Sequence, residues 1–279
     1  MTSVVAGLLC GALALLVPAL VRRVPEPAPA VEPALEELPE TVPESAAGSS
    51  SDEAPAPGPE PVEKELYADI ARRRGVAVGS VAASAAAGAV LGWSLGWSWS
   101  LLFLVPLVPV LVALAVVDWR TQLLPTWVIA RTYAVLVPLV LVVGLLTGEW
   151  DDVLRAFWGW LITGGLYFLL WFIHSAGLGY GDVRLSGIIG IVLGHLGWGT
   201  LFAGVYSAFI LGGVVGGVLA LLKVVDRRGV PFGPFMVAGA LLGVVLVPGP
   251  PRISVEAEAA RRLKRAWKNA AHAALAHRW

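Results

Sequence analysis

Long apolar runs separated by short polar turns cover most of the chain. A helix that crosses a bilayer needs about 20 mostly apolar residues, and eight runs approach this length. They lie at roughly residues 4–21, 76–94, 98–117, 127–147, 153–173, 184–197, 200–222 and 233–248. The sixth is short and rich in glycine. The pattern predicts an all-α, polytopic helical membrane protein with about eight transmembrane helices.

The pattern divides the chain into four expected parts. Residues 1–21 form a transmembrane anchor, and no basic residue precedes its apolar run, so an uncleaved anchor with its N-terminus outside is favoured over a secretory signal. Residues 22–66 are rich in Pro, Ala and Glu, which predicts a disordered acidic linker. Residues 67–250 form the helical membrane core. Residues 251–279 are basic and have the spacing of an amphipathic helix.

Composition supports this class and limits the function. The chain is 57% hydrophobic and 14% charged, whereas soluble domains are about 25% charged. The formal net charge is zero, so charge gives no argument for a nucleic-acid partner. A single cysteine, Cys10, predicts neither an internal disulfide nor a structural metal site.

Basic residues are expected on the cytoplasmic side of a multi-pass membrane protein. If the spans alternate, one side receives Arg22, Arg23, Arg72–Arg74, Arg120, Arg184, Lys223, Arg227 and Arg228. The tail after residue 251 carries seven Lys or Arg, although an eighth crossing places it outside. Two alternatives remain at this point: the tail lies on the outer surface, or one short segment is re-entrant.

Two aspartates are the candidates for chemistry. Asp118 ends the third predicted span, and Asp182 follows the fifth in "GLGYGD". The hairpin between them returns both carboxylates to one membrane face, where one can hold a proton while the other takes one from water. Ionisable residues at membrane depth are usually functional. Structural alternatives are a helix-end charge for Asp118 and an N-cap for Asp182, with the helix beginning near Val183.

Three motifs resemble those of the type IV prepilin peptidases, which are membrane aspartic peptidases of the Gly-x-Gly-Asp type. "VDWRTQLLP" is similar to the family's first aspartate motif, "GLGYGDVRLSGIIGIVLG" to its Gly-x-Gly-Asp motif and following helix, and "VPFGPFMVAGA" to the start of its last helix. The resemblance covers roughly residues 76–248. It implies Asp118 and Asp182 as the catalytic pair. The supporting motif residues are Gly179, Gly181, Arg184, Pro231, Gly233 and Pro234.

The resemblance implies a function as well as a site. The expected substrates are prepilins or pseudopilins, whose leader is cut at the cytoplasmic face of a prokaryotic inner membrane, with no cofactor and no metal. Many members also carry paired Cys-x-x-C motifs between the first two spans and methylate the new terminus. The linker holds no cysteine there, which puts methyl transfer in doubt. At the position of Arg184 the family usually has Lys; an interfacial anchor is the structural alternative for this arginine.

Two other functions compete with the peptidase. The same aspartates would serve a small proton- or cation-coupled transporter, although such sites usually lie near the midplane within inverted repeats. A non-catalytic pilus-assembly component would tolerate loss of either aspartate. His174, at the end of the fifth predicted span, either tunes the aspartate pair or is an interfacial histidine at a helix end.

Overall fold

The computed structural model describes residues 1–22, 74–173, 178–222, 231–247 and 267. All regular structure in this part of the chain is helical. The helices are α1 (Thr2–Ala14), α2 (Val17–Arg22), α4 (Arg74–Leu95), α5 (Leu101–Thr121), α6 (Thr126–Thr147), α7 (Trp150–Ile173), α8 (Tyr180–Leu196), α9 (Trp198–Leu221) and α10 (Gly233–Leu246). The predicted class, a polytopic helical membrane protein, is confirmed.

Each predicted span corresponds to a helix, but the helices differ in length. Six are long and apolar enough to cross a membrane, with α1 and α2 counted as one segment. Of the remaining two, α8 has 17 residues and α10 has 14. The third span extends further than predicted, because α5 continues to Thr121 and holds Asp118 within its last turns. The acidic linker after residue 22, His174 and nearly all of the basic tail lie outside the described residues.

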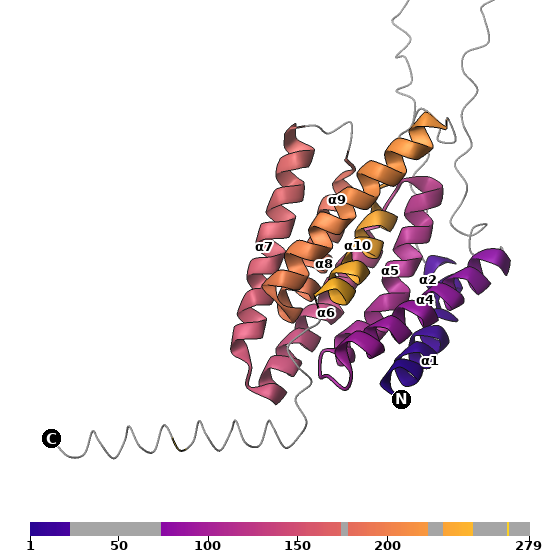
Figure 1. Cartoon of the computed structure of the whole chain (residues 1–279). Coiled ribbons are helices and arrows are strands. Elements are labelled where there is room, and N and C mark those ends of the chain that lie inside the picture. Colours follow the sequence, from indigo (N-terminus) through magenta and orange to yellow (C-terminus); the bar gives the residue numbers. More distant parts are fainter. Residues whose placement is uncertain (23–73, 174–177, 223–230, 248–266, 268–279) are drawn as a thin grey trace, which may run out of the picture.

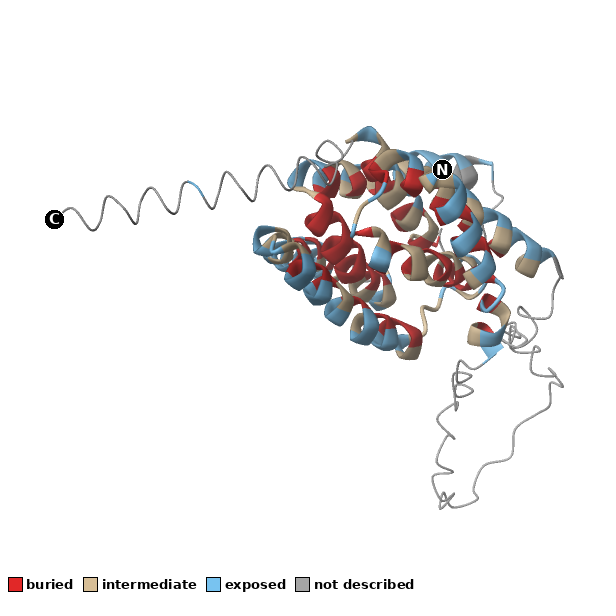
Figure 2. Cartoon of the chain, turned by 90° about the horizontal axis from the view of Figure 1, so that it is seen from below, coloured by how far each residue is buried: buried red, intermediate tan, exposed pale blue. Residues whose placement is uncertain are grey.

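Helices α6, α7, α9 and α10 all contact α8 (Figure 1), whereas α1, α2 and α4 pack together beside α5. Every residue of α8 from Leu185 to Leu196 is buried. Figure 2 shows exposed residues gathered on the outward sides of the surrounding helices. On α7 these include large apolar side chains such as Phe172 and Ile173, each 71% exposed. A bilayer is the environment in which such surfaces are stable.

Antiparallel helix pairs pack closely through glycine. A Cβ atom added to Gly194 of α8 would lie 2.6 Å from the Arg155 carbonyl oxygen of α7, and Gly159 and Gly190 also bring their two backbones into contact. The pairs α1–α4 and α9–α10 have similar contacts, at Gly92 and Gly243. Small residues at such interfaces allow the close approach from which membrane helices gain packing energy.

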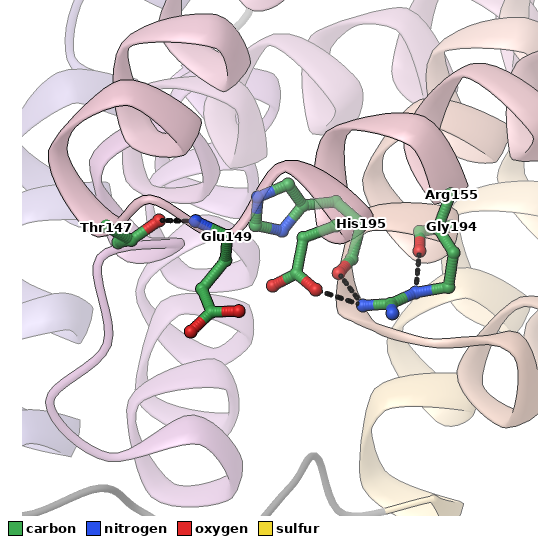
Figure 3. A network of polar contacts seen from close by, with 6 residues as sticks. Thr147, Glu149, Arg155, Gly194 and His195 are labelled. Atoms are coloured by element: carbon green, nitrogen blue, oxygen red, sulfur yellow. Dashed lines mark hydrogen bonds and ion pairs between the residues drawn. The ribbon is translucent and has the colours of Figure 1, made fainter. Parts of the chain in front are cut away.

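A polar network fixes the register of α7 and α8 at the C-terminal end of α8 (Figure 3). The Arg155 guanidinium donates from Nε to the Gly194 carbonyl and from Nη2 to the His195 carbonyl, each at 3.2 Å. It also pairs with Asp152 at 2.5 Å. A cation that binds the last carbonyls of a helix satisfies acceptors that have no partner within the helix. The network therefore anchors the end of α8 that lies opposite Asp182.

The glycine contacts give a testable difference in stability. We expect Gly194→Ala to destabilise the protein by about 1–3 kcal/mol, because the new methyl group would collide with backbone. The matched control is Gly164→Ala on α7, where no atom lies within 4 Å of an added Cβ atom. Thermal unfolding of both purified variants in the same detergent measures the difference. Equal melting temperatures for the two variants would contradict the role of this contact.

Candidate active site

Asp118 is held at the C-terminal end of α5 by the start of α10. The residue is 4% exposed. Its Oδ2 atom accepts a hydrogen bond of 2.9 Å from the backbone N–H of Gly233, a residue 115 positions away in the chain. The first N–H groups of a helix have no partner within the helix, so they are natural donors to an anion. The Pro-Phe-Gly-Pro-Phe motif thus reaches the first aspartate through its central glycine.

Position 233 favours glycine because a larger residue has no room beside Asp118, and not because its backbone φ is positive. A Cβ atom at this position would lie 2.6 Å from Asp118 Oδ2. Pro234, in the first turn of α10, has no N–H to leave unpaired, and Pro231 is buried just before the helix. Pro231 therefore lies outside the first turn, whereas Pro234 lies within it.

Asp182 lies at the third position of α8, not at the N-cap. The helix begins at Tyr180 with Gly179 as its N-cap, so the structural alternative that placed the helix start near Val183 is wrong. The Asp182 Oδ2 atom accepts a hydrogen bond of 3.1 Å from the Gly179 N–H. The side chain is 6% exposed, and its Oδ1 atom is buried without a hydrogen-bond partner among the described residues.

The Asp118 carboxylate acts electrostatically on Asp182. Asp182 lies in the first turn of α8, outside the six candidate spans. Burial and, to a smaller extent, the Asp118 carboxylate together raise the pKa of Asp182 to about 7, against the opposing effect of the hydrogen bond from Gly179. A carboxyl group with this pKa carries a proton at mildly acidic pH. The arrangement can therefore hold one proton between two carboxyl groups.

The remaining motif residues support α8. A Cβ atom at Gly181 would lie 2.7 Å from Leu124, so this glycine lets the loop after α5 pack against the start of α8. The Arg184 side chain donates to the Thr126 hydroxyl at the start of α6 and lies over the Tyr180 ring at 4.5 Å. Arg184 therefore ties α8 to α6, a role that the sequence did not predict for it.

Tyr167 of α7 is a neighbour of Asp182 that the sequence analysis missed. It is 1% exposed and interacts electrostatically with the Asp182 carboxylate. A single tyrosine in an apolar run belongs to no motif, and only the packing of α7 on α8 brings it to the site. Among the described residues, no group of three His, Cys, Asp or Glu side chains could hold a metal ion.

Fold and site together define a multi-pass membrane protein with two buried carboxyl groups where three helix ends meet. The model of the type IV leader peptidase family matches residues 105–221, which include Asp118 and Asp182. The match supports the prepilin peptidase family for this chain and confirms the resemblance seen in the motifs. Comparison with curated proteins and with solved structures gives no match. The family is one of peptidases, so a leader-peptidase-like protease is the general function indicated.

The contact between Gly233 and Asp118 predicts that a larger residue at position 233 lowers the rate of cleavage. We expect Gly233→Ala to reduce peptide cleavage at least about tenfold, because the methyl group would push Asp118 away from its N–H donor. The matched control is Gly213→Ala on α9, which has open space at its Cβ position. Cleavage rates of both variants at equal membrane levels measure the effect. Equal activity would show that Asp118 does not need the position that Gly233 gives it.

The raised pKa of Asp182 predicts a pH dependence. Below about pH 7 the pair keeps its shared proton, and above it the proton is lost. We therefore expect kcat/KM to fall as the pH rises through this value, and to fall again in acid when the remaining carboxylate is protonated. Rates measured from about pH 5 to about pH 9, with unfolding checked at each end, test this. A rate that rises steadily to the alkaline limit would be inconsistent with a shared proton.

Proposed function

We propose that this protein is an aspartic endopeptidase that removes the leader of prepilins or pseudopilins, with Asp118 and Asp182 as its catalytic pair. The proposal is supported above all by the burial of one carboxyl group on α5 and another on α8, the second of which feels the charge of the first. The family match supports a leader peptidase as the general activity. The alternative of a helix-end charge does not account for a second carboxylate beside the first.

The proposed chemistry needs one proton on the pair. The ionised carboxylate takes a proton from a water molecule, and the resulting oxygen bonds to the carbonyl carbon of the scissile peptide. The protonated carboxyl group donates its proton to the carbonyl oxygen. When the intermediate collapses, the C–N bond breaks and the nitrogen leaves as an amine after taking a proton from the pair. As the C–N bond breaks, one hydroxyl of the tetrahedral intermediate returns its proton to the pair and becomes the carbonyl oxygen of the new carboxyl terminus. One water molecule is consumed, and the pair again holds a single proton.

The cytoplasmic face is the proposed side of cleavage. Arg120 and Arg184 lie within two residues of the catalytic aspartates, and Arg131 lies in the second turn of α6. Positive residues favour the cytoplasmic side. Arg155 lies at the opposite end of α7 and α8, where it is paired with Asp152. A substrate with a short basic leader and an apolar helix would place its cleavage site at this membrane boundary.

Methyl transfer is not part of the proposed function. Family members with this second activity carry paired cysteines between the first two spans, whereas the sole cysteine here, Cys10, is buried within α1. A peptidase that uses two aspartates requires no cofactor, and we propose none.

Loss of either carboxylate tests the proposal directly. We expect Asp118→Asn and Asp182→Asn each to abolish shortening of a co-expressed prepilin, because each group has a separate role in one mechanism. Gel mobility and mass spectrometry of the substrate measure cleavage. The matched control is Asp151→Asn, an exposed residue in the first turn of α7, which should cleave normally. Substantial activity in either single variant, at normal membrane levels, would rule out the aspartic mechanism.

A further inference from the structure

Tyr167 is fixed in place by an aromatic cluster. Its ring stacks on Phe209 of α9, with ring centroids 5.3 Å apart and an angle of 27° between the planes. The centroid of the Phe232 ring lies 6.0 Å from that of Tyr167 and 5.6 Å from that of Phe209. Phe232 directly precedes Gly233, whose N–H holds Asp118. Gly233, which donates to Asp118, is therefore the chain neighbour of Phe232, whose ring packs on Tyr167.

The antiparallel register of α7 and α8 brings Tyr167 to the level of Asp182. Arg155 contacts the carbonyls of Gly194 and His195, and Thr163, eight residues further along α7, contacts Gly190. Because the helices run in opposite directions, one more turn of α7 reaches the first two turns of α8. This register agrees with the electrostatic interaction between Tyr167 and Asp182.

An unpaired acceptor lies at the same place. Asp182 Oδ2 is bonded to Gly179, but Oδ1 is buried and has no partner among the described residues. A buried carboxylate oxygen without a donor is costly. Among the described residues, the Tyr167 hydroxyl also makes no hydrogen bond. A tyrosine hydroxyl both donates and accepts, so it can bond a carboxyl group in either protonation state.

We propose that Tyr167 is a positioning residue of the aspartate pair, whose hydroxyl bonds to Oδ1 of Asp182 during cleavage. This inference rests on the proposed peptidase function. The hydroxyl donates to the ionised carboxylate and transfers no proton. It orients the carboxyl group and stabilises its charged form, while the aromatic cluster keeps the hydroxyl in place.

The variant Tyr167→Phe tests this inference, because it keeps the ring and removes only the hydroxyl. We expect kcat for cleavage of a purified prepilin to fall about tenfold with KM nearly unchanged, since the substrate does not bind to this group. Loss of a donor to the charged form raises the pKa of Asp182, so the alkaline limb of the pH–rate profile, which reports this group, should move to higher pH. The matched control is Tyr206→Phe on α9, whose side chain is 70% exposed and which should behave as the wild type.

A second readout does not depend on activity. Infrared titration of the buried carboxyl group should show a higher pKa for Asp182 in Tyr167→Phe than in the wild type. A Tyr167→Phe protein with an unchanged titration would overturn the inference, even if its kcat were reduced. If the wild type and Asp182→Asn cleave equally, the proposed catalytic role of Asp182 fails, and the titration still decides whether Tyr167 bonds to Asp182. If both aspartate variants are inactive but Tyr167→Phe cleaves with the rate and pH profile of the wild type, the catalytic pair stands and the role of Tyr167 is wrong.

Discussion

The close contact between α7 and α8 is the constraint on which the other features depend. Glycines at 159, 190 and 194 bring the two backbones together, and Arg155 binds the last carbonyls of α8. This contact fixes the register of the two helices. It thereby determines which residues of α7 lie beside the first turn of α8. Asp182 and Tyr167 become neighbours only in this register. A structural contact at one end of the helices thus sets the geometry of a site at the other end, about 20 Å away.

The site itself follows from the properties of helix ends in a low-dielectric environment. Each aspartate accepts one backbone N–H, Asp118 from Gly233 and Asp182 from Gly179, so each has one oxygen that is fixed. Burial and the Asp118 carboxylate both oppose ionisation of Asp182, which is the condition under which two carboxyl groups can hold a single proton. Both donors are glycines next to a helix start. The recurrence of glycine in these motifs therefore has a physical reason: it lets a carboxylate reach a backbone N–H.

Sequence reasoning predicted the helical membrane class, the places of the apolar helices, and both aspartates. The class is confirmed, because apolar run length is a local signal. The role of the two aspartates, which their charge within apolar surroundings suggests, stays a prediction. Sequence reasoning misplaced the start of α8, since a glycine N-cap gives no side-chain signal and Asp182 resembles a cap itself. It could not find Tyr167 or the bond from Arg184 to Thr126, because these contacts depend on the packing of helices distant in the chain.

The central claim is that Asp118 and Asp182 form one electrostatically coupled pair. An infrared titration of the protonated carboxyl band, in the wild type and in Asp118→Asn, measures this coupling without a substrate. The account predicts that the pKa of Asp182, about 7 in the wild type, falls in Asp118→Asn, because the neighbouring negative charge has been removed, yet stays above the ordinary value owing to burial. An Asp182 carboxyl group that titrates at the same pH in both proteins would contradict the claim that the two aspartates share a site.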